Sequence, residues 1–351
     1  WAAAMFSEVN DLLAWFTLAF VRLAEQVPYA SVDTSTFGWR ETVIYSAVIA
    51  MLFHLRDARF LKATAALMML FASALLFASA MEEQESVLRV TFLDVGQGDC
   101  AVVRFPGGET YVIDAGPAGG GKDAGEDVVA PFLRRQGVSR IDAVITTHPH
   151  ADHMGGVPAL LRGFEVLETI DPGQPLNSRL YGVYDALERD LPQTTARAGM
   201  VRSVSGVRVY FLHPTERNID RDSTDGYSDV NDVSVVMKVV YGSVSFLFMG
   251  DAEAESEREM TATYGGFMDA DVLKAGHHGS STSSTEELVE SVTPAHAVIS
   301  VARFNKFRHP SRKVIERFER AGAAVHRTDR DGAVVMETDG VRLTVRHWKE
   351  R

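Results

Sequence analysis

The sequence has very little cysteine and a shortage of positive charge. Cys100 is the only cysteine among 351 residues, so no disulfide can form within the chain. Its place in an apolar run is typical of a small core residue rather than a nucleophile. The chain has 47 acidic residues against 35 lysines and arginines, a formal net charge of −12. This balance argues against general coating of nucleic acid, which needs lysine and arginine to replace counterions, but not against a nucleic-acid substrate held by metal ions.

Long apolar runs are absent after residue 81 but present before it. Residues 63–81 carry no charge over a length sufficient to cross a bilayer, and a shorter apolar run occupies residues 41–55. We expect the two runs to form a hairpin of membrane spans; the alternative is a pair of core helices in a soluble domain. Residues 8–27 predict an amphipathic helix at the membrane interface. Because the chain begins at Trp1, we expect it to be part of a longer protein.

The charges that flank these runs predict the orientation. The loop between the two runs is basic, whereas the segment after the second run is acidic (Arg56, Arg59 and Lys62 against Glu82, Glu83 and Glu85). Short basic loops stay on the cytoplasmic side of a membrane. We therefore expect residues 1–82 to lie in the cell inner membrane and the remainder of the chain to lie on the extracytoplasmic face.

Residues 86–351 have the pattern of a separate α/β domain. Short apolar runs rich in β-formers alternate with amphipathic stretches such as 311–322, and polar clusters recur where the apolar runs end. This pattern favours two sheets packed together with helices outside.

The segment "THPHADH" is the clearest candidate for chemistry. It places His148, His150, Asp152 and His153 within six positions. Imidazole nitrogens and carboxylate oxygens are ligands for zinc, manganese and iron. The first two histidines alternate and can face one side, while Asp152 and His153 can reach a second ion. The segment therefore predicts two neighbouring metal sites.

Further ligands are expected at the ends of other apolar runs. Asp251 follows "SFLFMG" and suits a carboxylate that bridges two cations; capping of the acidic helix after it is the alternative. His277 and His278 in "LKAGHHGSS" predict one ligand and one neighbour that contacts substrate.

Three other residues are candidates for contact with the reacting groups. Asp99 lies in the turn "GQGDC" and either faces the metals or belongs to a plain hairpin. His309 in "FRHPS" is a candidate general acid or phosphate contact just before a helix. Lys274 either reaches a phosphate or faces solvent.

Taken in order, "FLDVGQGDC", "VIDAGP", "THPHADHMGG", "FLFMGDAE", "LKAGHHGSS" and "RHPS" resemble the metallo-β-lactamase superfamily. More narrowly, residues 86–347 are similar to the C-terminal domain of ComEC-type DNA-internalisation proteins, the membrane channels of natural transformation. The resemblance implies a metallo-β-lactamase αββα sandwich. It also implies that the apolar N-terminal part corresponds to the end of that family's membrane-embedded competence domain.

The resemblance also implies a ligand set. His148 and His150 would bind one metal, and Asp152 and His153 the other. Asp251 would bridge the two ions.

Four further positions complete what the resemblance implies. His278, or in second place His277, would complete the second site, and Asp114 would brace the histidine loop by hydrogen bonds. Many members supply a third histidine to the first metal, and Asn231 resembles the ComEC-branch occupant of that place. An oxygen ligand there shifts the preferred metal from zinc toward manganese.

Two divalent metal ions (Zn²⁺ or Mn²⁺) suit hydrolysis of a phosphodiester, because they activate a bridging water and clamp an in-line displacement. The resemblance sharpens this to a nuclease that degrades the strand not taken up during DNA import. Its substrate would be single-stranded DNA, and its partners the membrane, the rest of the competence channel and the DNA-uptake machinery. Alternatives are hydrolysis of a small ester or a phosphocholine-type substrate, and a non-catalytic domain that gates DNA. The residues expected to take part in catalysis are Asp99, Asp152, Asp251, Lys274 and His309.

Overall fold

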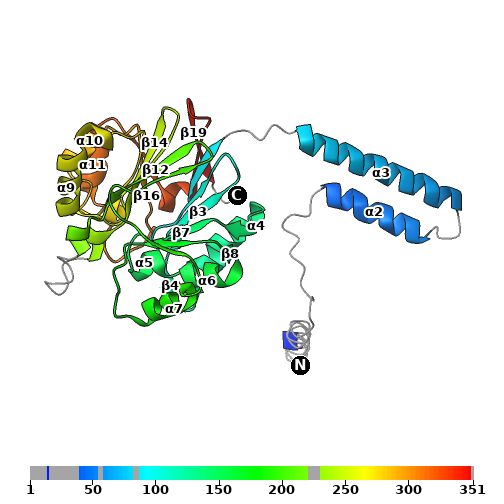
Figure 1. Ribbon diagram of the computed structural model, residues 1–351, viewed down its shortest axis with the longest axis horizontal. Helices are drawn as coiled ribbons and strands as arrows, with labels where there is room; N and C mark the ends of the chain where they lie inside the picture. Colours follow the sequence, from blue (N-terminus) through cyan, green and yellow to red (C-terminus); the bar gives the residue numbers. More distant parts are fainter. Residues whose placement is uncertain (1–13, 16–38, 54–57, 82–86, 220–229, 349–351) are drawn as a thin grey trace, which may run out of the picture. The chain divides into compact units, whose positions relative to one another are not determined.

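The computed structural model describes residues 14–15, 39–53, 58–81, 87–219 and 230–348 (Figure 1). The chain divides into two units, Trp1–Ala80 and Met81–Arg351. The boundary expected from the sequence falls at residues 82–86, which lie outside the described residues.

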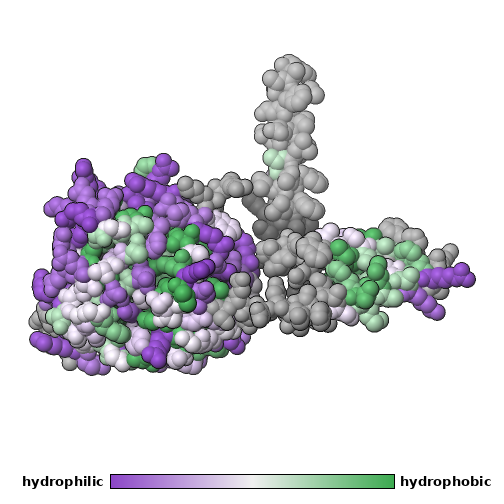
Figure 2. Space-filling view, turned by 90° about the horizontal axis from the view of Figure 1, so that it is seen from above, coloured by the Kyte–Doolittle hydropathy of each residue, from purple (hydrophilic) through white to green (hydrophobic). Residues whose placement is uncertain are grey.

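Within the described residues after position 38, the first unit contains the helices α2 (Trp39–Phe53) and α3 (Ala58–Met81). They cover most of the two apolar runs, whereas the amphipathic helix expected at residues 8–27 lies outside the described residues except for positions 14–15. Among the described helices, none combines the length and the apolar character needed to cross a membrane. Both helices nevertheless expose large apolar side chains, and Figure 2 shows hydrophobic residues on the part of these helices that is coloured. These side chains are Val43, Ile44, Tyr45, Val48, Leu67, Met69 and Leu70.

Within the described residues, the second unit is built on two large sheets. The eight-stranded sheet has the order β10-β9-β7-β3-β2-β1-β18-β19, and the seven-stranded sheet runs from β11 to β17 in sequence order. The strands of the first sheet are β1 (Leu88–Phe92), β2 (Ala101–Arg104), β3 (Thr110–Ile113), β7 (Ala143–Ile145), β9 (Thr169–Asp171), β10 (Gln193–Thr195), β18 (Ala333–Thr338) and β19 (Leu343–Trp348). Those of the second are β11 (Val201–Val204), β12 (Val207–His213), β13 (Val236–Tyr241), β14 (Val244–Phe248), β15 (Val272–Lys274), β16 (His296–Ile299) and β17 (Ala324–Arg327). Two further sheets have two strands each: β4 (Ala118–Gly119) with β5 (Lys122–Asp123), and β6 (Arg140–Ile141) with β8 (Glu165–Val166).

Helices cover the outer faces of the two sheets (Figure 1). Those packed on the first sheet are η1 (Gly125–Val129), α4 (Ala130–Arg135), α6 (Val157–Gly163) and α7 (Arg179–Glu188). Those packed on the second are α9 (Ala254–Tyr264), η3 (Gly265–Met268), α10 (Glu286–Val292) and α11 (Arg312–Arg320). The remaining short helices are α5 (Ala151–Met154), η2 (Val230–Val233), η4 (Gly276–Gly279) and α12 (Thr328–Asp331).

Three apolar clusters account for this layering. The central cluster joins the facing surfaces of the two sheets, with Phe92 and Phe248 in tilted contact at 5.8 Å between ring centroids. Each outer cluster joins the other face of one sheet to its helices. Both faces of the central strands are therefore buried, which explains their continuous apolar runs. The result is the αββα sandwich expected from the sequence.

The parallel strands place the polar clusters at one edge. Strands β3, β7 and β9 run parallel in one sheet, and β14, β15 and β16 run parallel in the other. The carboxyl ends of parallel strands meet at the same edge of a sheet, which is where open α/β sheets bind ligands. The segments that follow β3, β7, β14 and β15 carry Asp114, the histidine loop, Asp251 and His278.

Candidate metal centre

The histidine loop turns directly out of β7 into the short helix α5. His148 and His153 are fully buried, whereas the Asp152 side chain is 34% exposed. The glycine turn at residue 98 packs closely against this loop, because a Cβ on Gly98 would lie 2.2 Å from the Asp152 carbonyl oxygen. Gly98 therefore allows a close approach that a side chain at this position would prevent.

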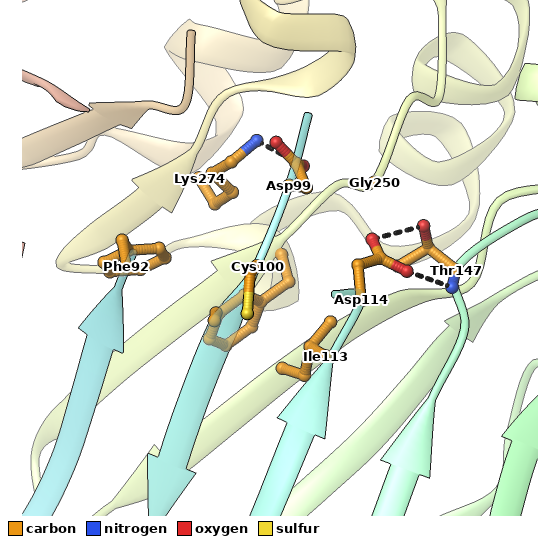
Figure 3. Close-up of a pocket in the computed structure, with 10 residues that line it drawn as sticks. Phe92, Asp99, Cys100, Ile113, Asp114, Thr147, Gly250 and Lys274 are labelled. Carbon is orange, nitrogen blue, oxygen red and sulfur yellow. Dashed lines mark hydrogen bonds and ion pairs between the residues drawn. The ribbon is translucent and has the colours of Figure 1, made fainter. Parts of the chain in front are cut away.

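Asp114 contacts the histidine loop through Thr147 and His153. Its carboxylate accepts hydrogen bonds from the backbone N–H and the hydroxyl of Thr147, at 2.8 and 2.7 Å. Figure 3 shows this carboxylate pointing at Thr147 from the end of its strand. Asp114 Oδ2 also lies 2.7 Å from His153 Nδ1, which orients the other ring nitrogen, Nε2, toward Asp251. Burial raises the pKa of Asp114 although His153 opposes the shift. Asp114 thus contacts both Thr147 and His153 of the histidine loop, and its bracing role stays a prediction.

Asp251 lies where the two sheets bring their histidines together. Its carboxylate oxygens are 3.1 Å from His153 Nε2, 3.7 Å from His278 Nε2 and 3.9 Å from His148 Nε2. The helix after it starts at Ala254 with Glu253 at the N-cap position, so Asp251 does not cap that helix. Of the two interpretations of Asp251, the geometry favours the one that places it among the metal ligands.

Both His277 and His278 approach Asp251, with His277 Nε2 3.8 Å from its carboxylate, but only His278 also contacts Asp152 and Asp99. The His278 ring is buried, and its Nε2 lies 3.3 Å from Asp152 Oδ2, while its Nδ1 lies 3.1 Å from Asp99 Oδ1. His277 is 26% exposed, and its Nδ1 is held by Glu253 at 2.6 Å. Both residues have positive φ angles of 44° and 53°, and this unusual backbone separates the two rings.

Lys274 is buried beneath the cluster rather than exposed on its surface. Its ammonium lies 2.6 Å from Asp99 Oδ2, as Figure 3 shows, and also donates to the Ala275 carbonyl at 2.9 Å. The expected contact with a phosphate is thus replaced by an ion pair within the protein. Lys274 acts on the site by holding Asp99.

The buried carboxylates of the cluster favour protons on His153 and His278. Burial by itself would lower the pKa of His278, but Asp251 and Asp99 outweigh it and raise this pKa to about 9. Burial likewise opposes protonation of His153, yet Asp251 and Asp114 hold its pKa well above the usual value. Conversely, burial would raise the pKa of Asp99, but Lys274 and His278 lower it to about 2. The carboxylates of the cluster thus stabilise positive charge in a buried environment.

The donor set fits a divalent metal. Asp99, His153, Asp251 and His278 each offer a ligand atom, and these four atoms lie within 4.8 Å of one another. Each of the four residues also has one buried side-chain nitrogen or oxygen that makes no hydrogen bond. Unsatisfied buried polar atoms are costly, so four of them close together suit a site that binds a cation. Two imidazoles with two carboxylates suit zinc, manganese or iron.

His148 and His150 lie beside this group. His148 Nε2 is 3.0 Å from His150 Nδ1, and the His148 ring centroid is 4.2 Å from that of His153. Burial and the His153 charge lower the pKa of His148 well below its usual value. A neutral imidazole with a free lone pair is the form that binds a metal ion.

Asn231 and His213 are also buried. Asn231 lies in η2 and hydrogen-bonds Glu253, while His213 is bound through Nδ1 to the Ser234 carbonyl at 2.9 Å. His213 is not among the four residues of the group. Glu253 itself was not expected from the sequence, although the spacing "DAE" after a buried strand was a signal for it.

His309 lies at the mouth of the cluster. Its ring centroid is 5.6 Å from that of His277, and Asn305 both donates to its carbonyl and accepts from its N–H. Burial and the neighbouring His277 and His278 lower the pKa of His309. The neutral ring suits a hydrogen-bond contact with a phosphate better than the alternative role of general acid.

These features define the class of protein. The family model described as the metallo-beta-lactamase superfamily matches residues 93–303, more than half of the chain. The chain therefore belongs to the metallo-β-lactamase superfamily.

Within this superfamily, the chain is similar to competence proteins. ComE operon protein 3 of Bacillus subtilis (strain 168) is 30% identical over 261 residues, 70% of this chain and 32% of that protein. Competence protein ComA of Neisseria gonorrhoeae is 31% identical over 256 residues, 73% of this chain and 33% of that protein. The resemblance to ComEC-type competence proteins is confirmed at this level, and the chain spans about a third of the length of these relatives.

Solved structures include one that is similar to the chain. Igni18, a metallo hydrolase from the archaeon Ignicoccus hospitalis KIN4/I, is 16% identical with a TM-score of 0.46, covering 75% of this chain and 100% of its own.

Proposed function

We propose that the second unit is a dinuclear metal-dependent phosphodiesterase, a nuclease that degrades the non-transported single strand during DNA uptake. The carrying observation is the convergence of four residues, each with an unsatisfied buried donor or acceptor, beside two further histidines. Similarity to competence proteins supports DNA as the substrate.

The roles proposed for the ligands follow the two groups of contacts. One ion would be held by His148 and His150, and the other by Asp152, His153 and His278. Asp251, which faces three of these histidines, would bridge the two ions. Asn231, which resembles the third ligand of the first ion, would supply an oxygen to that ion.

Bound divalent ions would supply an activated water and charge neutralisation at phosphorus. The residues of the chain would orient the ligands and bind the phosphate. Asp114 fixes the tautomer of His153, and Lys274 holds the Asp99 carboxylate toward His278. His309 and His277, which lie at the mouth, would contact the phosphate oxygens.

The test is cleavage of end-labelled single-stranded DNA by the full chain, with manganese or zinc and with EDTA. We expect cleavage only with metal, and a loss of at least a hundredfold in Asp251→Asn. Asp142→Asn is the matched control, because Asp142 accepts a backbone N–H at 2.8 Å at the opposite end of β7. Bound metal without cleavage would contradict a nuclease and favour small phosphoesters or a DNA-gating role.

We further propose that α2 and α3 associate with the inner membrane and place the second unit on the extracytoplasmic face. The exposed apolar side chains of both helices support membrane contact. We expect the full chain to float with lipid vesicles and Val48→Asp to weaken this. Val341→Asp, at a 75% exposed residue of the other unit, is the control. Equal flotation of both variants would argue against the proposal.

A further inference from the structure

A loop beside the metal centre exposes two aromatic rings in a basic setting. In the segment "RFNKFR", residues 303–308, Phe304 is 89% exposed and Phe307 is 52% exposed. A cation lies over each ring: Arg303 is 5.7 Å from the centroid of Phe304, and Lys306 is 4.9 Å from that of Phe307. The segment contains three basic residues and no acidic one, in a chain of net charge −12.

The loop is connected to the centre by a row of rings. Phe307 stacks on His309 with centroids 5.6 Å apart and an angle of 10°, and His309 contacts His277 at the same centroid distance. His277 Nε2 lies 3.8 Å from Asp251. Asn305 stiffens the loop, because its amide donates to the carbonyls of Ala302 and His309.

We propose that the loop 303–308 is a binding site for a single-stranded polynucleotide, whose bases stack on Phe304 and Phe307 while its phosphates contact Arg303, Lys306 and Arg308. Proteins that bind single strands combine aromatic platforms with cationic side chains in this way. The row of rings leads the bound strand to the metal centre. The inference rests on the proposed function, to which it adds the surface that selects a polymer over a small phosphodiester.

An open groove continues the surface. Arg303, Phe304, Arg327, Asp329 and Arg330 line it. Asp329 is paired with Arg327 at 2.7 Å, so its charge is compensated within the groove. The cationic surface therefore extends beyond the loop, as a strand of several nucleotides requires.

Binding is measured with the full chain in EDTA, so that no cleavage takes place, by fluorescence anisotropy of labelled oligothymidine and oligouridine. Leucine keeps the apolar volume but lacks the aromatic face. We expect Phe304→Leu/Phe307→Leu to weaken binding of both oligonucleotides about a hundredfold, roughly tenfold for each ring. Phe267→Leu is the control, since Phe267 is 42% exposed with Lys238 4.7 Å from its centroid in another part of the unit, and should bind as wild type.

The salt dependence of binding tests the cationic residues. Replacement of Arg303, Lys306 and Arg308 by glutamine should make the slope of log K against log salt less steep by about 2. Anionic vesicles test the competing partner, a membrane surface. Two outcomes would overturn the proposal. In the first, the chain binds the vesicles and the leucine variant keeps its affinity for the oligonucleotides. In the second, all loop variants bind the oligonucleotides as tightly as the wild type. Neither result touches the nuclease assay, which decides the proposed function by itself.

Discussion

Single carboxylates decide how the buried histidines are oriented. Asp114 receives two hydrogen bonds from Thr147 and one contact from His153, and so sets which nitrogen of His153 faces Asp251. Partners of metal-binding histidines typically account for ten- to a hundredfold in metal affinity.

Asp114→Asn should therefore weaken metal binding by about ten- to a hundredfold, because an amide nitrogen cannot accept from Thr147 and His153 together. Competition with a chromophoric chelator measures the affinity. Asp142→Asn should leave it unchanged. Equal affinities in both variants would remove the bracing role from Asp114.

The ion pair of Lys274 with Asp99 is a second effect at this scale. Lys274→Met leaves a buried carboxylate without its cation, and we expect a loss of about 3 kcal/mol in the free energy of unfolding. Urea unfolding of the metal-free chain measures it. The double variant Asp99→Asn/Lys274→Met should recover part of the loss, since the unpaired charge is gone. A double variant as unstable as the sum of the two single variants would show that the pair is not coupled.

At the scale of elements, the loop after His278 depends on helix α9. The buried Glu257 of this helix accepts backbone N–H groups of Ser284 and Thr285, the latter at 2.8 Å. Arg317 of α11 donates to the Ser284 carbonyl from the other side. Two helices thus hold the segment that positions His278.

Glu257→Ala should lower the free energy of unfolding by about 2–3 kcal/mol, because two backbone donors lose their acceptor away from water. Denaturant unfolding followed by circular dichroism measures the change. Glu290→Ala, at an exposed position of α10, should change stability by no more than about 0.5 kcal/mol. A similar cost in both variants would mean that Glu257 does not hold the loop.

At the scale of the whole molecule, the two sheets stay aligned partly through the cluster between their edges. A ligand that binds the folded state stabilises it by about 2.7 kcal/mol at a hundredfold excess over its Kd. We expect EDTA to lower the Tm of the full chain by several degrees, and His153→Ala to abolish this shift. Calorimetry measures both.

A second group of possible ligands provides the control. Among the described residues, His326, Asp331 and His347 also bring ligand atoms within 4.8 Å. His347→Ala should keep the EDTA-dependent shift in Tm. If that variant loses the shift and His153→Ala keeps it, the stabilising metal lies at the second group.

Much of the fold followed from local pattern. The apolar runs predicted strands, because a strand buried on both faces needs apolar residues throughout. The helix expected over "SRKVIERFERAG" agrees with α11. The helix boundaries and the order of strands across the sheets did not follow, since they depend on contacts between distant parts of the chain.

By itself, the sequence determined which residue types could bind a metal: a clustered histidine–aspartate loop and carboxylates at strand ends. With a single cysteine, it excluded a site built from several thiolates. Only the tertiary structure decided which residues meet. Asp99, His153, Asp251 and His278 converge because two sheets pack with their strand ends at one edge. The same packing buries His278 against Asp99 while His277 stays partly exposed, and it makes Lys274 the partner of Asp99. Burial and distance are properties of the packed chain, and no pattern within a single segment encodes them.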